Sequence, residues 1–171
     1  MKLSRKLCLR GWRCEEGGAA IEFILIFPIF LAIFAAIIAF GLGFFVQQTM
    51  TLAAEEGARA AIAVDPATLG GVEAAAYHDA IRTQAQAFIT ANLTGLPTGL
   101  RSGITTPTPT LTPITDSSGA VVGQTLTVFV QYANFDDNPV IQPLTSIFPL
   151  VLVSALVVPD NLAAQAVVQL F

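Results

Sequence analysis

The sequence predicts an α+β protein with a long apolar helix near its N-terminus, a second amphipathic helix and a small antiparallel β-sheet. Three observations support this fold class. The 24 residues 23–46 contain 21 apolar side chains and no charge. Residues 72–93 carry apolar side chains at helical spacing. From residue 100 onward Thr, Pro, Gly and β-branched residues predominate, which is typical of strands and turns.

The composition of the chain excludes several classes of protein. Of its 171 residues 54% are apolar and only 12% are charged, and the mean hydropathy is +0.68. A soluble domain carries roughly 25% charged residues, so the chain is not a typical soluble enzyme, and it is too apolar to be disordered. Its net charge of −4 argues against nucleic acid as a partner.

The apolar segment 23–46 predicts a transmembrane helix, because about 20 apolar residues span the hydrocarbon core of a bilayer. A buried core helix is disfavoured, since the segment is apolar on every face. A cleaved secretory signal would have an apolar region of only about 7–15 residues. Pro28 removes one backbone hydrogen bond and predicts a kink early in this helix, although proline can also simply be tolerated there.

The flanking charges predict the orientation of this helix. Five of the eight basic residues precede it, namely Lys2, Arg5, Lys6, Arg10 and Arg13. Positively charged flanks stay in the cytoplasm, so we expect the N-terminus inside and residues from about 55 onward outside. Cys8 and Cys14 both lie in this basic leader, on the reducing side, and their spacing without a neighbouring His does not complete a zinc site.

The long helix is predicted to run from about residue 19 to about residue 63, where Asp65-Pro66 stops it. Near its end Glu55 and Arg59 are four residues apart, in the order that favours an ion pair. A loop over 66–71 leads to a second helix over 72–93. Its expected apolar stripe consists of Val72, Ala76, Ile81, Ala85, Phe88 and Leu93. His78, the one histidine, is interpreted as a surface residue without chemistry.

The C-terminal half is expected to form the sheet. Residues 104–115 contain three prolines, which predicts an edge strand with breaks. A hairpin turn over 116–119 follows. The clearest strand is 121–132, in which Leu126, Val128 and Val130 alternate with Thr125, Thr127, Phe129 and Gln131. Residues 162–171 also alternate and could form the closing strand.

Two further segments complete the exported half. Residues 134–143 are predicted to form a loop. Residues 144–158 are apolar but are broken by Pro149 and are too short to span a membrane, so we expect a buried or interfacial helix or turn. Asp136 and Asp137 could ligate calcium with Asn138, but without the spacing of an EF-hand loop a solvated turn is the favoured interpretation. We expect no catalytic residues, no metal and no cofactor, because no nucleophile with an adjacent base is visible.

The junction between the basic leader and the apolar helix is the most informative part of the chain. Residues 15–23 read Glu-Glu-Gly-Gly-Ala-Ala-Ile-Glu-Phe, which places Glu22 at the start of the apolar segment. A charge at the bilayer centre costs about 2.5–3.5 kcal/mol, so a carboxylate at the membrane edge is a functional candidate. Glu22 is equally well explained as an interfacial carboxylate at a helix N-terminus, where the helix dipole favours it.

This junction resembles the class III prepilin processing site of type IV pilins. In those proteins a basic leader ends in Gly, and Glu is the fifth residue of the mature chain. Cleavage between Gly17 and Gly18 would make Glu22 the fifth residue here. The resemblance implies a 17-residue leader with a net charge of +3 and a mature chain of 154 residues with a net charge of −7. It also implies that Glu22 pairs with the new α-amino group of a neighbouring subunit.

A wider stretch resembles the TadE-like family of the tight adherence (Tad) pilus system. Residues 18–28 show Gly, small residues, Ile-Glu-Phe and then Pro28. Residues 47–61 begin with Gln-Gln and end with Ala-Ala-Glu-Glu-Gly-Ala-Arg-Ala-Ala. The resemblance covers about residues 11–62. It is looser over the last predicted strand, 162–169, where this chain lacks the charged ending often seen in the family.

The resemblance implies a minor pilin or pseudopilin that takes part in assembling a Tad-type pilus for surface adhesion. Its implied location is the bacterial inner membrane or the pilus. Its implied partners are a prepilin peptidase, other pilins or pseudopilins, the Tad inner-membrane assembly platform and the lipid bilayer. The expected organisation is a cytoplasmic leader (1–17), a long helix (18–64) and an exported domain (65–171). The alternative is an uncleaved bitopic membrane protein with an extracytoplasmic binding module; a membrane-anchored hydrolase is disfavoured.

Overall fold

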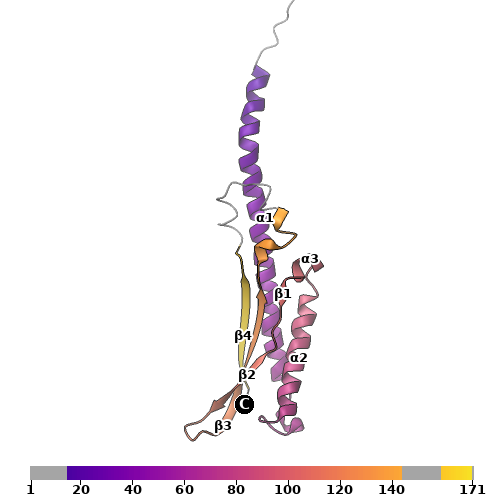
Figure 1. Ribbon diagram of the computed structural model, residues 1–171, viewed down its shortest axis with the longest axis vertical. Helices are drawn as coiled ribbons and strands as arrows, with labels where there is room; N and C mark the ends of the chain where they lie inside the picture. The colour runs from indigo at the N-terminus through magenta and orange to yellow at the C-terminus, as the bar shows by residue number, and fades with distance from the viewer. Residues whose placement is uncertain (1–14, 144–158, 171) are drawn as a thin grey trace, which may run out of the picture. The chain divides into compact units, whose positions relative to one another are not determined.

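The computed structural model describes residues 15–143 and 159–170. They form an α+β fold with one long helix, further helices and a small antiparallel sheet, as the sequence predicts (Figure 1). In chain order the elements are α1 (Glu15–Ile62), η1 (Pro66–Leu69), α2 (Ala75–Leu93), α3 (Thr98–Arg101), β1 (Ile104–Thr105), β2 (Thr110–Thr115), β3 (Val121–Tyr132), η2 (Phe135–Asp137) and β4 (Leu162–Leu170).

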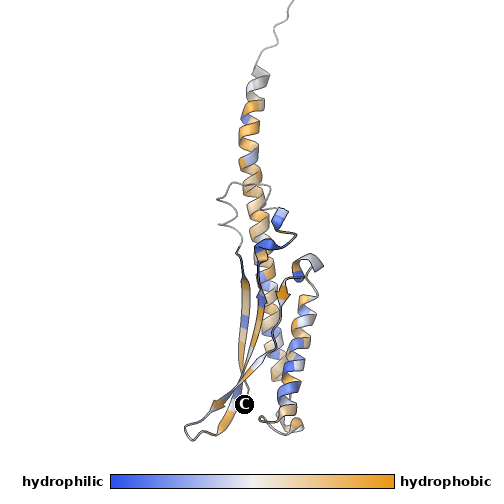
Figure 2. Ribbon diagram, viewed as in Figure 1, coloured by the Kyte–Doolittle hydropathy of each residue, from blue (hydrophilic) through white to orange (hydrophobic). Residues whose placement is uncertain are grey.

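The chain divides into two compact units at a point within α1, between Phe34 and Ala35. In the first unit every residue from Gly18 to Phe30 is exposed, although nearly all are apolar (Figure 2). The phenylalanines of this unit stack in pairs one helical turn apart, Phe23 on Phe27 and Phe30 on Phe34. Among the described residues, α1 is the one helix long and apolar enough to cross a membrane.

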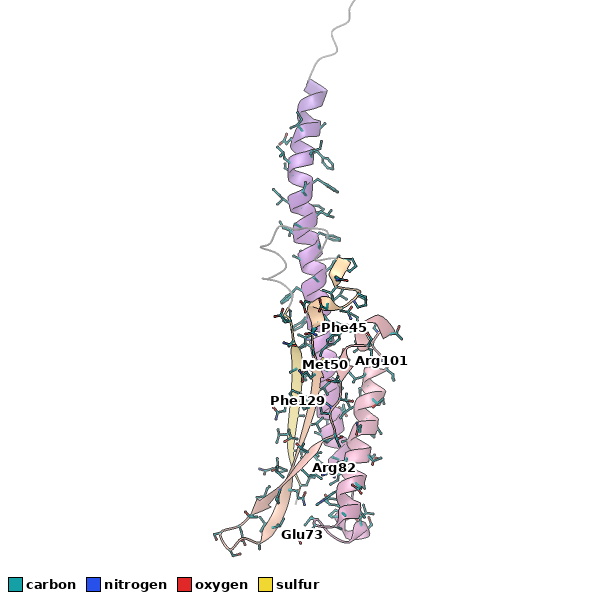
Figure 3. All side chains as sticks on the ribbon, in the orientation of Figure 1. Phe45, Met50, Glu73, Arg82, Arg101 and Phe129 are labelled. Atoms are coloured by element: carbon teal, nitrogen blue, oxygen red, sulfur yellow. The ribbon has the colours of Figure 1, made fainter. Side chains whose placement is uncertain are left out.

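The second unit contains the hydrophobic core, to which the second half of α1 contributes one face. Buried residues of α1 recur at spacings of three and four, and Val46, Met50, Ala54 and Ala58 form a row spaced by four within them. Those of α2 also form a row spaced by four, at Tyr77, Ile81, Ala85, Ile89 and Leu93. Rows of residues spaced by four are the ridges with which helices pack into one another's grooves. Met50 is labelled in Figure 3, on the part of α1 that lies beside α2 and the sheet.

The sheet is built around β3. Its residues Thr125 and Leu126 pair with both β2 and β4, so these two strands flank β3 on opposite sides. Gln131 and Tyr132 pair in the same way with both β1 and β4. β1 and β2 therefore form one interrupted edge strand over 104–115, as its three prolines predict. The predicted turn at 116–119 and the closing strand are present, and Leu126, Val128 and Val130 face the core.

The predicted apolar stripe of the second helix is wrong at two positions. Ala76 and Phe88 are exposed, and Tyr77 and Ile89 are buried in their place. The helix begins at Ala75 rather than at residue 72, and its buried row advances by four residues at each step. A row of residues spaced by four is inclined to the helix axis. The predicted stripe is parallel to the axis, so it leaves the buried row at Ala76 and at Phe88.

Smaller expectations also change. Arg59 pairs with Glu56, at 2.8 Å between Nη1 and Oε1, and not with Glu55. The expected loops at 66–71 and 134–143 contain the short 3-10 helices η1 and η2. The residues expected to form an interfacial helix or turn, 144–158, lie outside the described residues, as do residues 1–14 of the leader.

Candidate functional site

The predicted processing residues lie in the first turn of α1, which begins at Glu15. Gly17 and Gly18 are consecutive helical residues, and nothing lies within 4 Å of the position that a Cβ of Gly18 would occupy. Glycine is about 1 kcal/mol less favourable than alanine in a helix. Two adjacent glycines therefore lower the helix propensity of this turn.

Glu22 lies four residues after Gly18, and both are exposed. Residues four apart lie one above the other on the same helix face. The ion pairs among the described residues are Arg59–Glu56 and Arg82–Asp79, so Glu22 takes part in neither. Its neighbours Ile21 and Phe23 are also more than 60% exposed. A lone carboxylate thus stands on an apolar, uncovered helical surface, one turn from the predicted new N-terminus.

Pro28 lies inside α1, six residues after Glu22, within the exposed apolar segment. Its ring cannot donate a backbone hydrogen bond, so the carbonyl one turn earlier loses its partner in the helix. In a membrane such a carbonyl is satisfied by neighbouring helices, side chains or ordered water. The kink expected at Pro28 remains a prediction.

A side-chain hydrogen bond ties α1 to the sheet at the end of the apolar segment. The Nε2 amide of Gln47 donates to the carbonyl oxygen of Ala163 in β4, at 2.8 Å. Ala163 lies on the edge strand β4. Carbonyls of an edge strand that point away from the sheet have no neighbouring strand to bond with. This bond joins the residue that follows the apolar segment to the second residue of β4.

A second polar contact links the segment before α2 to the sheet. Gln124 is 5% exposed, and its Nε2 donates to the carbonyl oxygen of Val72 at 3.0 Å. The same atom lies 2.6 Å from Nε2 of His78. His78 is therefore half-buried and partnered, which corrects its interpretation as a surface residue. Burial raises the pKa of the neighbouring Tyr77 above its ordinary value of 10.0, and the carboxylate of Asp65 acts in the same direction.

The loop after β3 is organised by a buried asparagine. Asn138 is 3% exposed; its Nδ2 donates to the carbonyl oxygen of Gly99 and to the hydroxyl of Tyr132, and its Oδ1 accepts from the N–H of Val140. The two aspartates before it, Asp136 and Asp137, lie in η2. Within residues 15–143 and 159–170, no three His, Cys, Asp or Glu side chains are grouped so that they could hold a metal ion.

Sequence reasoning did not single out Gln47, Gln124 or Asn138 as structural contacts. For Gln124 a signal was present, since it has the same phase in β3 as Leu126 and Val128 and so had to face the core. Gln47 bonds Ala163, which is 116 residues away in the chain, and the most distant partner of Asn138, Gly99, is 39 residues away. No local pattern predicts contacts over such separations.

A comparison with known protein families gives a match in the N-terminal part of the chain. Residues 17–59 match the sequence profile of the TadE-like protein family, which confirms the resemblance seen in the sequence. The match begins at Gly17 and includes Glu22, Pro28 and the part of α1 that enters the core. No curated protein matches the chain. No solved structure matches it.

Proposed function

We propose, from the TadE-like match over residues 17–59, that the protein is a minor pilin or pseudopilin that takes part in assembling a Tad-type pilus. One observation carries the proposal: the match begins at the glycine that precedes the proposed cleavage point, and Glu22 follows at the head of an apolar helix. The role is structural rather than catalytic. The protein spans the inner membrane once, with its leader in the cytoplasm and its α+β unit outside.

Processing requires the first turn of α1 to open. A peptidase cleft binds an extended and unhindered peptide, and the bond between Gly17 and Gly18 lies in a helical turn. The low helix propensity of glycine reduces the cost of unwinding that turn. No side chain from either glycine obstructs access to the bond. The partner that this chemistry requires is a prepilin peptidase acting at the cytoplasmic face.

Cleavage also creates a positive charge, which is opposite to that of the Glu22 carboxylate. The new α-amino group of Gly18 is cationic, and the Glu22 carboxylate lies one helical turn away on the same face. A carboxylate that leaves water for an apolar helix bundle needs a partner. The α-amino group of a neighbouring subunit supplies it in an assembled filament. Before assembly, the carboxylate is favoured by the partial positive charge at the helix N-terminus.

The cleavage step is tested by sequencing the N-terminus of the full chain extracted from membranes, with and without the prepilin peptidase. We expect the chain to begin at Gly18 when the peptidase is present and at Met1 when it is absent. Gly17→Leu should leave the chain at full length, whereas Gly41→Leu, at an exposed glycine far from the site, should be processed normally. A start other than Gly18 in the presence of the peptidase would exclude this cleavage site.

The assembly step is tested separately with Glu22→Ala. This variant should be cleaved normally but should be depleted from the sheared pilus fraction, because its subunits lack the carboxylate partner. Glu55→Ala is the matched control, since Glu55 is an exposed carboxylate on the same helix, outside the apolar segment. If Glu22→Ala enters the pilus fraction as well as the unchanged protein does, Glu22 is an interfacial carboxylate without a role in assembly.

The second candidate is an uncleaved bitopic membrane protein with an extracytoplasmic binding module. The folded second unit, with its own core, supports this reading. It predicts an N-terminus at Met1 in every condition and strict retention in the membrane fraction. The sequencing experiment therefore separates the two candidates.

A further inference from the structure

A small apolar groove lies in the second unit, where α1 passes the beginning of β4. It has a volume of about 150 Å³, and it is lined by Phe40, Gly43, Phe44, Gln47, Pro159 and Leu162. The phenylalanine rings of Phe40 and Phe44 stack at 6.4 Å between centroids and are 63% and 56% exposed. The groove thus opens beside large apolar side chains on α1.

Among the described residues of the wall, one has a polar side chain, and its amide nitrogen already has a partner. The amide of Gln47 donates to the carbonyl oxygen of Ala163, one residue beyond Leu162. The other described residues that line the groove are glycine or have apolar side chains, and none of them is charged. A polar ligand would therefore lose its hydration without gaining matched partners, which is costly. The chemistry of the wall selects a hydrocarbon group.

The position of the groove along the apolar segment identifies the source of that hydrocarbon. About 20 helical residues span the hydrocarbon core of a bilayer, and the segment 23–46 is longer than this. The groove residues Phe40, Gly43 and Phe44 lie in the last third of this segment, toward its C-terminal end. The groove therefore lies at the level where the acyl chains meet the headgroups. The burial of Ala39, Gly43 and Val46 shows that the folded unit already contacts α1 at this level.

We propose that this groove binds the acyl chain of a phospholipid from the outer leaflet of the same membrane. The inference rests on α1 spanning a bilayer, but not on cleavage or on a role in a pilus. An apolar cavity of about 150 Å³ in another protein stays dry and takes up benzene, so a groove of this size accommodates a short length of hydrocarbon chain. Binding there seats the start of β4 against the lipid surface.

The test uses the full chain in vesicles of phosphatidylethanolamine and phosphatidylglycerol. A small proportion of the lipid carries a photoactivatable diazirine on one acyl chain, close to the glycerol. After illumination the labelled residues are identified by peptide mass spectrometry. We expect labels on Pro159 and Leu162, which belong to the β4 region and not to α1. Val122 and Val167, which are apolar and 49% and 58% exposed but do not line the groove, should be labelled several-fold less.

Residues 23–34 serve as the internal standard for membrane insertion. If they are labelled but Pro159 and Leu162 are not, the lipid groove is excluded and the membrane span stands. If residues 23–34 are not labelled, the span itself fails, and with it both the groove and the membrane part of the proposed function. Leu162→Phe narrows the groove and should lower the labelling of Pro159 without changing that of residues 23–34.

A second measurement tests whether something other than lipid occupies the groove. Benzoylphenylalanine in place of Phe44 should capture lipid in the same vesicles. Capture of a second copy of the chain, or of residues 144–158 of the same chain, in place of lipid would overturn the proposal. The diazirine assay uses the unmodified protein, so it still tests the proposal if one of the variants fails to fold.

Discussion

Gly57 of α1 packs directly against Ile89 of α2. A methyl group on Gly57 would stand 2.6 Å from Cγ1 of Ile89 and 3.2 Å from the carbonyl oxygen of Ala85. Both helices are therefore held at a separation that only glycine allows. We predict that Gly57→Ala destabilises the fold, because overpacking costs about 1–3 kcal/mol and exceeds the gain in helix propensity of at most about 1 kcal/mol. The midpoint of thermal unfolding, followed by circular dichroism in detergent, measures the change.

Gly41→Ala is the matched control for this substitution. Gly41 lies on the same helix, and nothing is within 4 Å of the position of its missing Cβ. The gain in helix propensity is the same, without the clash, so the midpoint should stay constant or rise. Adding Ile89→Ala to Gly57→Ala should cost less than the two single losses together, since it makes room for the new methyl group. Equal effects of Gly57→Ala and Gly41→Ala would contradict the close contact.

A second prediction concerns the hydrogen bond from Gln47 to Ala163. Gln47→Leu keeps the size of the side chain but removes the donor, and we expect a loss of about 0.5–1.5 kcal/mol in the free energy of unfolding. Gln48→Leu, at the exposed neighbouring position, should change it by less than about 0.5 kcal/mol. Chemical denaturation in detergent distinguishes the two variants. If Gln48→Leu lowers the free energy of unfolding more than Gln47→Leu does, the hydrogen bond from Gln47 to Ala163 is not important for stability.

A third prediction concerns Asn138. Asn138→Ala removes the hydrogen bonds to the Gly99 carbonyl and the Val140 N–H, and it leaves the buried Tyr132 hydroxyl without this partner. Such a loss costs about 1–3 kcal/mol. The control is Asn92→Ala, because Asn92 bonds only the exposed carbonyl of Phe88 on its own helix; its effect should stay within about 0.5 kcal/mol. Thermal unfolding of both variants decides whether Asn138 organises the loop after β3.

A fourth prediction concerns pH at the tip of the hairpin between β2 and β3. Hydrogen bonds from the Ser118 side chain and from the backbone N–H groups of Ala120 and Ser118 lower the pKa of Asp116 below its ordinary value of 3.8. A carboxyl whose folded pKa is depressed stabilises the fold above its unfolded pKa and loses that contribution as the pH falls through the folded pKa. The turn should therefore be ordered at neutral pH and should loosen only in acid.

NMR measures this effect directly. The Asp116 carboxyl should titrate below the same residue in an unstructured peptide of residues 112–124, and amide exchange at Ser118 and Ala120 should quicken as it protonates. Amide exchange has an intrinsic dependence on pH. In Asp116→Asn the exchange at Ser118 and Ala120 should follow that intrinsic dependence alone over this pH range. A carboxyl that titrates as in the peptide would show that these hydrogen bonds are not populated.

Most of the fold could be predicted from local patterns. The apolar segment, the prolines of the β1–β2 edge and the alternation in β3 each act within a few residues, so they specify their elements without reference to the rest of the chain. The second helix shows where this stops. Ile81, Ala85 and Leu93 were placed correctly, but Ala76 and Phe88 were not. The inclined row that is buried depends on how α2 crosses α1, and the close contact between them joins residues distant in sequence, Gly57 and Ile89.

The candidate site divides in the same way. Gly17, Gly18 and Glu22 are visible because a short spacing carries the signal, and the structure adds that Gly18 and Glu22 share a helix face. The groove at Phe40 and Leu162 brings together segments more than 100 residues apart, and its apolar wall looks in sequence like any other part of a membrane helix or a strand. Only the folded arrangement separates these residues from their neighbours.

The lengthwise packing of the second half of α1 against α2 and the long strands has a mechanical consequence (Figure 1). A pull along the axis of this part of α1 acts parallel to the surfaces that hold it, so it loads them in shear. Buried side chains from Ala39 to Ala61 would have to slide together, rather than separate one after another. The bond between Gln47 and Ala163 lies near the end of the interface where such a load enters. The second half of α1 is thus anchored to resist traction without any disulfide in the residues that the structure describes.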